Sequence, residues 1–338
     1  MTPGRAPMAV SVSAEPKVAW LLPVRNGMPY LRETLESLAA QTRAGDEVLA
    51  WDDGSTDGSG DELRRWLPSR LPGRVVSSEA VTLGPALREL VKLAEAPLLA
   101  RIDADDVALP DRLALQVEAM QRDKRLVLVG GQAGCVDAEG RRRDDWAQLP
   151  TRDRDCRWQV RFANPFMHPA VLFSREAALR AGNYAQTTRD QDLYLWTRMA
   201  PLGRMVNLSE KVIDYRLHDA SVTATGRGRA EADRRRRREL LWPWMLPGLP
   251  RAQALRLLEL LADPHDLDLT WAEVQALSDA ARSAAEKCGE RPTYFKHAGL
   301  YKRQRASLRT RWLKRRRWVS PVWPVAKAVR RLAPGQAA

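Results

Sequence analysis

Residues 97–106, PLLARIDADD, join a short apolar run to a cluster of carboxylates. The first six residues have the length and composition of a buried strand, and Asp103, Asp105 and Asp106 follow at its carboxyl end. Two carboxylates one residue apart, on a loop that leaves a buried strand, can bind a hard divalent cation through oxygen. The same residues would also suit a solvated acidic turn before the next helix. The stretch by itself leaves both interpretations open.

Strands and helices are expected to alternate on both sides of this stretch. The expected strands are Val18–Val24, Glu47–Trp51, Val75–Val76, Pro97–Ile102 and Leu126–Gly130. One expected helix begins at Pro29, and the others cover Ser59–Trp66, Pro85–Ala94 and Asp111–Arg122. The alternation predicts an α/β domain with a Rossmann-like, mostly parallel sheet and helices on both of its faces.

A second pair of acids, Asp52 and Asp53, follows the second expected strand and precedes turn-forming residues. Turn chemistry would explain this pair as well. In such sheets, however, ligands bind in the crevice outside the carboxyl ends of the strands, and both acidic clusters are expected there. One carboxylate of the pair could accept hydrogen bonds from a nucleobase or ribose, while a cation at Asp103 and Asp105 would bridge phosphates. Together the two clusters predict a nucleotide site with its diphosphate beside Asp103.

Charge is distributed unevenly along the chain. The net charge is +13, yet residues 1–225 hold 30 Lys and Arg against 31 Asp and Glu, whereas residues 226–338 hold 25 against 11. We therefore expect a disordered leader at 1–16, an α/β catalytic domain at 17–224, and a helical, basic, Trp-rich extension at 225–338. This division favours chemistry in the first part and attachment to an anionic partner in the last.

The composition also limits the setting of the protein. Cys135, Cys156 and Cys288 have neither metal-ligand spacing nor a disulfide pattern, which favours a reduced, cytoplasmic environment. The first 16 residues lack the continuous apolar run of a signal peptide. No uncharged apolar stretch reaches the roughly 18–20 residues needed to cross a bilayer.

Seven segments in a fixed order make the sequence similar to a known family. They are Pro23 with Asn26; Asp52 to Asp57; Asp103 to Asp106 with Leu109 to Leu113; Asn164-Pro165 with His168-Pro169; Gly182 to Tyr184; Asp190 to Leu193; and Tyr215 to His218. Residues 18–224 thereby resemble the inverting glycosyltransferases of family 2, which have the GT-A fold. The resemblance implies transfer of a hexosyl or N-acetylhexosaminyl group from a nucleotide-diphosphate-sugar, with UDP as the expected nucleotide. The expected acceptor is a hydroxyl of a saccharide or lipid-linked saccharide, in envelope or capsule polysaccharide synthesis.

The resemblance also implies roles for individual residues around the donor. The implied nucleotide-sugar site comprises Pro23, Arg25, Asn26, Asp52, Asp53, Arg88, Asp103, Ala104 and Asp105. Pro23 and Asp53 are expected to line the nucleoside pocket, with Asp53 favoured over Asp52 for the base contact. Asp103 and Asp105 are expected to hold the donor and a Mn²⁺ or Mg²⁺ ion, with Asp105 as the direct metal ligand.

For the proton transfer, the resemblance implies Asp190 as the catalytic base, in a single displacement that inverts the anomeric carbon. Asp192 is the alternative base, because an extended chain would place both carboxylates on one face, whereas on a helix they would diverge. His218 is a candidate further metal ligand, since neutral imidazole suits Mn²⁺, or a diphosphate contact. His168 is expected to be structural.

Three positions depart from the family pattern. Arg25 stands where the family usually has an aromatic residue that packs on the base, so a guanidinium is expected to replace the stacking contact. Arg88 occupies a position often held by Asn near the donor. Arg189 replaces an acid that commonly precedes the catalytic base, and a neighbouring cation would make Asp190 a weaker base. These departures leave the reaction class unchanged and leave the donor sugar open.

In residues 291–331, Lys and Arg are interleaved with Trp312, Trp318 and Trp323, and no acid intervenes. Polybasic segments with Trp bind anionic membrane surfaces, so we expect a peripheral enzyme on the inner face of the membrane. Nucleic-acid binding, which is less favoured, and a solvated tail are the alternatives. A non-catalytic GT-A-like adaptor for a membrane or a nucleic acid is the alternative function. A sugar nucleotidyltransferase is disfavoured, because its glycine-rich signature near the first strand is absent.

Overall fold

The computed structural model describes residues 15–160, 164–186, 190–218, 239, 242–243 and 250–255. The chain divides into two compact units, Met1–Arg234 and Arg235–Ala338. Nearly all described residues belong to the first unit, which contains the whole sheet. The basic segment 291–331 and almost all of the expected leader lie outside the described residues, so their expected roles stay predictions.

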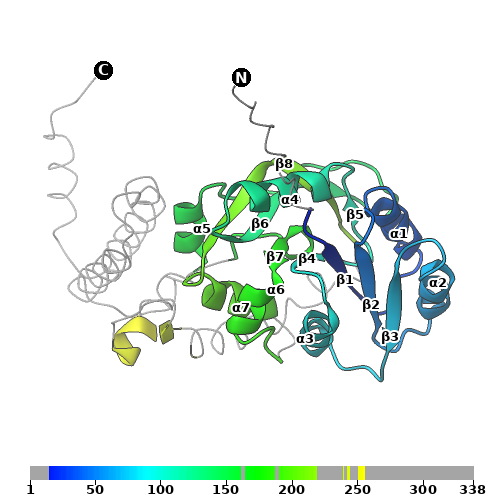
Figure 1. Ribbon diagram of the computed structural model, residues 1–338, viewed down its shortest axis with the longest axis horizontal. Helices are drawn as coiled ribbons and strands as arrows, with labels where there is room; N and C mark the ends of the chain where they lie inside the picture. The colour runs from blue at the N-terminus through cyan, green and yellow to red at the C-terminus, as the bar shows by residue number, and fades with distance from the viewer. Residues whose placement is uncertain are drawn as a thin grey trace, which may run out of the picture. The chain divides into compact units, whose positions relative to one another are not determined.

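An eight-stranded sheet forms the centre of the first unit, in the order β3-β2-β1-β4-β7-β6-β8-β5 (Figure 1). The strands are β1 (Val18–Val24), β2 (Glu47–Asp52), β3 (Gly73–Ser77), β4 (Leu98–Arg101), β5 (Val107–Ala108), β6 (Leu126–Val136), β7 (Leu172–Ser174) and β8 (Arg204–Arg216). From β3 to β4 every pairing is parallel, as predicted. The second half is mixed, since β7 runs antiparallel to both β4 and β6, β6 and β8 are parallel, and β5 is antiparallel to β8.

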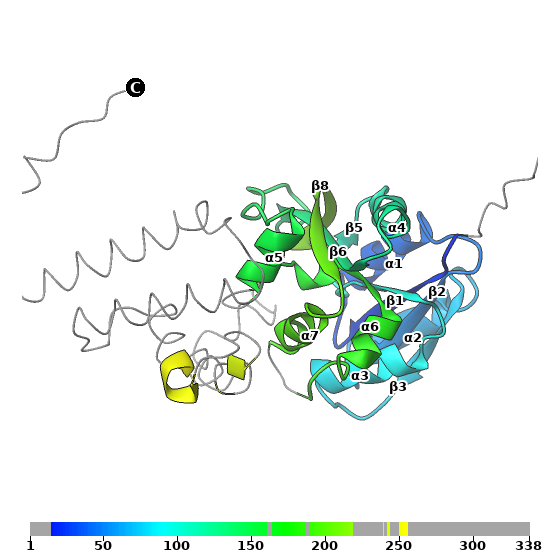
Figure 2. The same ribbon diagram turned by 60° about the vertical axis from the view of Figure 1, so that its left-hand side comes forward.

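Helices cover both faces of the sheet, as expected. They are α1 (Leu31–Ala39), α2 (Ser59–Trp66), α3 (Leu83–Leu93), α4 (Arg112–Arg122), α5 (Asp153–Gln159), α6 (Arg175–Arg180) and α7 (Gln191–Met199), with a 3-10 turn at His168–Ala170. Side chains of α1, α2 and α4 share one core cluster with Trp20 and Leu22 of β1. Helices α3, α6 and α7 lie together on the opposite side (Figure 2). The site described below therefore has one face towards α1 and another towards α7.

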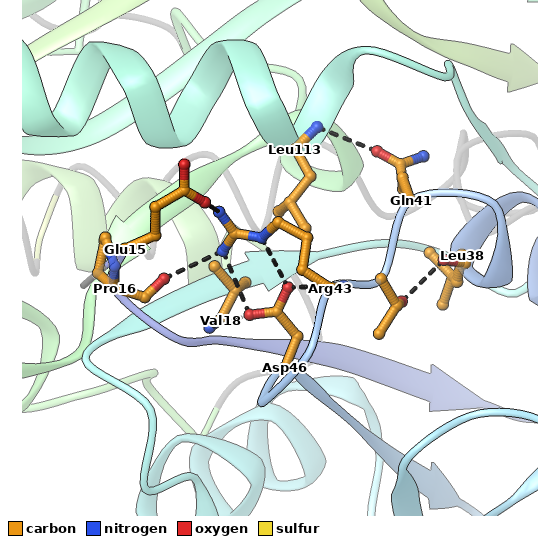
Figure 3. Close-up of polar contacts among 9 residues, drawn as sticks. Glu15, Pro16, Val18, Leu38, Gln41, Arg43, Asp46 and Leu113 are labelled. Carbon is orange, nitrogen blue, oxygen red and sulfur yellow. Dashed lines mark hydrogen bonds and ion pairs between the residues drawn. The ribbon is translucent and has the colours of Figure 1, made fainter.

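The central strand β1 is buried along its whole length, which is why it is a continuous apolar run in the sequence. Its start is held by polar contacts, because Asp46 Oδ1 accepts the Val18 amide at 2.8 Å (Figure 3). The Arg43 guanidinium donates hydrogen bonds to both oxygens of the Asp46 carboxylate and to the Pro16 carbonyl. These contacts fix where β1 begins, and hence how far its carboxyl end extends towards the acidic residues.

A short strand pairing connects the acidic loop 103–106 to β8, the last strand of the sheet in sequence. Directly after Asp106, β5 pairs with β8, with Val107 opposite Asp214. Because β8 ends at Arg216, this pairing brings the segment 216–218 beside the loop 103–106.

Among the described residues, no helix is long and apolar enough to cross a membrane.

Candidate functional site

Two acidic clusters lie at the same edge of the sheet. Strands β2 and β4 flank β1 on its two sides and run parallel to it. Their carboxyl ends therefore deliver Asp53 and Asp103 to either side of the end of β1, where the Asp53 amide donates to the Val24 carbonyl at 2.8 Å. This is the arrangement predicted for a nucleotide crevice.

On the β2 side, Asp53 is buried and its carboxylate holds the segment that leads into α3. Its Oδ1 accepts the Val81 amide at 2.6 Å, and its Oδ2 lies 3.3 Å from the Thr82 amide. Arg25 approaches the same carboxylate, with Nη1 3.8 Å from Oδ2, and 57% of its side chain is exposed. The Asp53 carboxylate and the Arg25 guanidinium give this side of the site hydrogen-bond acceptors as well as donors.

Asp52 and Asn26 shape the turn after β2. Asp52 Oδ1 accepts the Ser55 amide at 3.0 Å, and Asn26 Oδ1 accepts the Thr56 amide at 2.9 Å. Asn26 itself has a φ of 53°, in the left-handed region that Asn tolerates. Both predicted residues thus lie at the expected edge, and the contacts described for them are within the loops that form it.

The loops after β1 and β4 are in contact. A Cβ atom on Gly27 would come within 3.1 Å of Ala104 Cβ, so a larger residue at either position would push the loops apart. This contact places Ala104, predicted at the donor site, against the turn after β1 that contains Arg25 and Asn26.

The acidic cluster at the end of β4 is compact. Asp103, Asp105 and Asp106 each offer a carboxylate oxygen, and these oxygens lie within 4.8 Å of one another. Asp106 is fully buried; its Oδ1 accepts the Arg216 amide at 2.9 Å, while its Oδ2 has no hydrogen-bond partner among the described residues. Burial, together with the charges of Asp103 and Asp105, raises the pKa of Asp106 well above its usual value.

His218 joins this cluster from the end of β8. Its Nε2 lies 2.7 Å from Asp105 Oδ2, and its ring packs at 5.0 Å from the ring of Tyr30. Arg216 supports the arrangement, since its Nε donates to the Asp105 carbonyl at 2.9 Å and its guanidinium lies 4.7 Å from the Tyr30 ring centroid. The structure thus brings together Asp105 and His218, two of the three residues predicted to hold a metal ion.

The residues of this cluster fit a hard divalent cation. Carboxylate oxygens and an imidazole are ligands that Mn²⁺ and Mg²⁺ sites use, with imidazole favouring Mn²⁺. Asp106 Oδ2, which has no hydrogen-bond partner among the described residues, is a further acceptor, and a cation would offset the repulsion among the three carboxylates. Asp105 and His218 would hold the ion, because Asp103 is already paired with Arg101.

The candidate bases lie at the start of α7. Asp190 occupies the position before the helix with a φ of 55°, and its side chain is partly exposed. Asp192 lies two residues further on, in the first turn of α7. It accepts a hydrogen bond from the Leu193 amide at 2.8 Å and another from the Asn164 side-chain amide at 2.5 Å. Burial, followed by the charge of Asp190, raises the pKa of Asp192. The neighbouring Arg189 lies outside the described residues.

Two further predicted residues make contacts within the fold. His168 Nε2 lies 3.0 Å from the Tyr184 hydroxyl, and burial together with the charge of Arg101 lowers the pKa of His168 well below its usual value. A neutral, hydrogen-bonded histidine agrees with its expected structural role. Arg88 donates through Nη1 to the carbonyls of Gly182 and Tyr184, both at 2.9 Å. A donor contact by Arg88 stays a prediction.

Residues 20–179 match the model of the family described as glycosyl transferase family 2. The chain is 31% identical over 188 residues to the amylovoran biosynthesis glycosyltransferase AmsE of Erwinia amylovora, covering 55% of this chain and 70% of that protein. The chain belongs to glycosyl transferase family 2. Another relative, a UDP-Gal:alpha-D-GlcNAc-diphosphoundecaprenol beta-1,3-galactosyltransferase of Escherichia coli, is 24% identical over 208 residues, which are 60% of this chain and 74% of that one.

Solved structures of other glycosyltransferases share the fold of this family 2 member. S. aureus TarS 1–349 in complex with UDP-GlcNAc has a TM-score of 0.57 at 16% identity, covering 80% of this chain and 81% of that one. The mannosyltransferase PcManGT of Pyrobaculum calidifontis, in complex with GDP-Man and Mn²⁺, has a TM-score of 0.52 at 20% identity, covering 88% and 84%. The GT-A fold expected from the resemblance is therefore confirmed.

Several residues that shape this glycosyltransferase site were given no role from the sequence, although Asn164 and Arg216 lie in segments that carry the family resemblance. They are Tyr30, Glu33, Arg101, Asp137, Asn164 and Arg216. Arg216 alone contacts four of the groups around the acidic loop, yet its only local signal is its place two residues before His218. Arg101 did have a signal, since it is a lone cation inside an apolar strand.

Proposed function

We propose that this glycosyltransferase is divalent-metal-dependent and inverting, and that its donor is a UDP-linked hexose or N-acetylhexosamine. Its proposed acceptor is a hydroxyl of a saccharide or lipid-linked saccharide in envelope or capsule polysaccharide synthesis. The observation that carries the metal proposal is the contact between Asp105 and His218, from strand ends 113 residues apart in sequence. A carboxylate and an imidazole 2.7 Å apart, beside two further carboxylates, form a ligand set that no acidic turn requires.

The donor is proposed to lie along the edge from Asp53 to Asp105. Asp53 and Arg25 would bind the base and ribose, and Pro23 would line the pocket, because these residues meet at the ends of β1 and β2. Asp105 and His218 would hold a Mn²⁺ or Mg²⁺ ion, which when bound neutralises the charge that develops on the departing diphosphate. UDP is proposed because relatives or neighbours carry it in their names: a UDP-Gal-dependent galactosyltransferase and TarS with UDP-GlcNAc.

Asp190 is proposed as the base that takes the proton of the acceptor hydroxyl. Both oxygens of Asp192 already accept hydrogen bonds, one from Leu193 and one from Asn164, so this carboxylate is better placed to hold the start of α7. A single base and a single displacement invert the anomeric configuration without a covalent enzyme intermediate.

Nucleotides are expected to protect the folded chain against heat only when a divalent cation is present. At about 100 times its Kd, a bound donor should raise the Tm by roughly 5–10 °C, because ligand that binds only the folded state stabilises it. A panel of UDP-, GDP-, TDP- and CMP-sugars with Mn²⁺ or EDTA, followed by differential scanning fluorimetry, identifies the nucleotide. Asp53→Asn should reduce protection by UDP itself.

As the control for the panel, Asp61→Asn changes an exposed acid of α2 whose described contact is an ion pair with Arg64. It should behave as the wild type. Metal-independent protection, or none by any nucleotide-sugar, would count against the proposed donor site.

Attachment to the inner face of the membrane is proposed for the basic segment 291–331. Lipid-linked acceptors are presented at such a surface, and each Lys or Arg near an anionic bilayer contributes on the order of 1 kcal/mol to binding. We expect the full chain to sediment with vesicles containing anionic phospholipid, and a chain ending at residue 290 to stay in the supernatant. Neutral phosphatidylcholine vesicles are the control. Equal sedimentation of the two chains with anionic vesicles would contradict the proposal.

A further inference from the structure

A buried arginine at the end of β4 lies beneath the acidic loop. Arg101 is the last residue of β4, and only 1% of it is exposed. The other side chains of this strand are apolar, so a guanidinium here bears a large desolvation cost that well-paired contacts must offset. Its position therefore calls for a reason beyond packing.

The contacts of Arg101 are directed at one residue. Its Nη1 donates to Asp103 Oδ2 at 2.5 Å, and its Nη2 donates to Asp103 Oδ1. Both carboxylate oxygens of Asp103 are thus held by one planar group, which fixes the carboxylate in orientation as well as in charge. The remaining nitrogen, Nε, is buried without a hydrogen-bond partner among the described residues. The described hydrogen bonds of the guanidinium are therefore those to Asp103.

The pair lies on the side of the sheet that faces the candidate base. Leu98, Ala100 and Ile102 belong to the core cluster that includes α1, α2 and α4, and side chains of a strand alternate between the faces. Arg101 and Asp103 consequently lie on the opposite face. There the charge of Arg101 acts on His168, Tyr184 and Asp192, the groups packed around the start of α7.

Asp105 has a different set of contacts. Its Oδ2 lies beside His218, and its backbone carbonyl accepts a hydrogen bond from Arg216 Nε. Arg216 is the last residue of β8, and His218 follows it by two residues. The two acids of the Asp-Ala-Asp motif therefore have different partners. Asp103 is paired with the guanidinium of Arg101, and Asp105 lies beside the imidazole of His218. A guanidinium cannot give up its charge, whereas an imidazole can release its proton and bind a metal.

We propose that Arg101 is a positioning residue that reserves Asp103 for the hydroxyls of the donor sugar and leaves cation binding to Asp105 and His218. This proposal rests on the metal site of the proposed function. With its charge cancelled and its oxygens oriented by Arg101, Asp103 accepts hydrogen bonds from the sugar on the face towards α7. Without Arg101, neither oxygen of Asp103 would be held, and this carboxylate, within 4.8 Å of the other two, would be available to the cation as a further ligand.

The proposal predicts an unusual combination of effects. Arg101→Met should bind Mn²⁺ about tenfold more tightly than the wild type, because the two oxygens of Asp103 become available as ligands, yet it should transfer sugar more slowly because Asp103 is no longer oriented. Asp103→Asn should bind Mn²⁺ within about threefold of the wild type, since the ligands of the ion remain. Asp105→Asn should lose Mn²⁺ binding. The measurement is a titration of the full chain with Mn²⁺ alone, followed by electron paramagnetic resonance of the free ion.

Folding is checked in the same samples, because a buried arginine is removed. Asp103 is 31% exposed, so its carboxylate keeps contact with water in Arg101→Met. Arg101→Lys retains the positive charge but cannot make the bidentate pair of hydrogen bonds to Asp103. It should leave Mn²⁺ affinity near that of the wild type while slowing sugar transfer. The double variant Arg101→Met/Asp103→Asn removes both charges, and should return Mn²⁺ affinity to near the wild-type value.

The outcomes separate this proposal from the metal site on which it rests. Failure of the wild type to bind Mn²⁺ would overturn the metal site itself. Loss of Mn²⁺ binding in Asp103→Asn, with the wild type binding, would make Asp103 a direct ligand and overturn the role of Arg101. Unchanged or weaker Mn²⁺ binding in a folded Arg101→Met would have the same consequence, because a merely structural arginine predicts no gain.

Discussion

Replacing Asp105 by asparagine is expected to reduce sugar transfer by at least roughly 10²–10³-fold, the range found when a group that stabilises transition-state charge is removed. Asparagine keeps the size of the side chain and one carbonyl oxygen but loses the negative charge that faces His218 at 2.7 Å. The loop should keep its shape, because its backbone is held by Arg216 through the Asp105 carbonyl and by β5 pairing with β8. The measurement is donor-dependent release of nucleoside diphosphate with saturating Mn²⁺.

A matched control is available on the next loop, between β5 and α4. Asp111 is exposed and makes no side-chain hydrogen bond at the start of α4, so Asp111→Asn removes a nearby acid without touching the cluster. This variant should retain wild-type activity. If Asp105→Asn retained activity as well, with the same response to Mn²⁺, the cation would have to be bound elsewhere and the role given to Asp105 would be wrong.

The second large effect is expected at Asp190. Asp190→Asn should lower kcat by about 10²–10⁴-fold, the contribution of a general base, and leave the KM for the donor nearly unchanged. The reason is that Asp190 would act on the acceptor, whereas the proposed donor site lies at the ends of β1, β2 and β4. Initial rates at varied donor concentration and fixed acceptor separate the two constants.

Asp192 provides the comparison for this prediction. An asparagine at 192 still offers an oxygen to the Asn164 amide, so Asp192→Asn should cost less than Asp190→Asn. A larger loss of kcat in Asp192→Asn than in Asp190→Asn would assign the base to Asp192. Its burial and raised pKa would then be the features that suit it to accept a proton.

Local patterns in the sequence predicted the first half of the domain well. The run Val18–Val24 and the helix Ser59–Trp66 have the same bounds in sequence and structure, because apolar periodicity and the turn residues beside them are local properties. Helices α3 and α4 begin and end within two residues of the prediction. Since both acidic clusters follow strands of this half, their common edge could be predicted too.

The second half of the sheet could not be predicted in the same way. Strand β7 has three residues and β5 has two, too short for any periodicity, and their order is set by pairing across the fold. Strand β6 extends to Val136, beyond the predicted end at Gly130, because β8 pairs with its later part through irregular register. These are long-range choices that a local pattern does not contain.

The site was likewise predicted where motif residues carry it and missed where packing does. Asp105 and His218 were expected together from the resemblance, and they are in contact. Arg101 and Arg216 were not expected, since their roles exist only once β4, β5 and β8 lie side by side. The sequence also could not predict that Asp106 Oδ2 has no hydrogen-bond partner in the described part of the chain, because this depends on the complete burial of Asp106.

The claim that this family 2 glycosyltransferase works through a cation at Asp105 and His218 is tested most directly by removing divalent cations. The measurement is nucleoside-diphosphate release by the wild-type chain, with the donor selected by the thermal panel, after treatment with EDTA and then after adding back Mn²⁺. We predict that release stops with EDTA and returns with Mn²⁺, and that Asp105→Asn does not regain it. Release at an unchanged rate in EDTA would contradict the account.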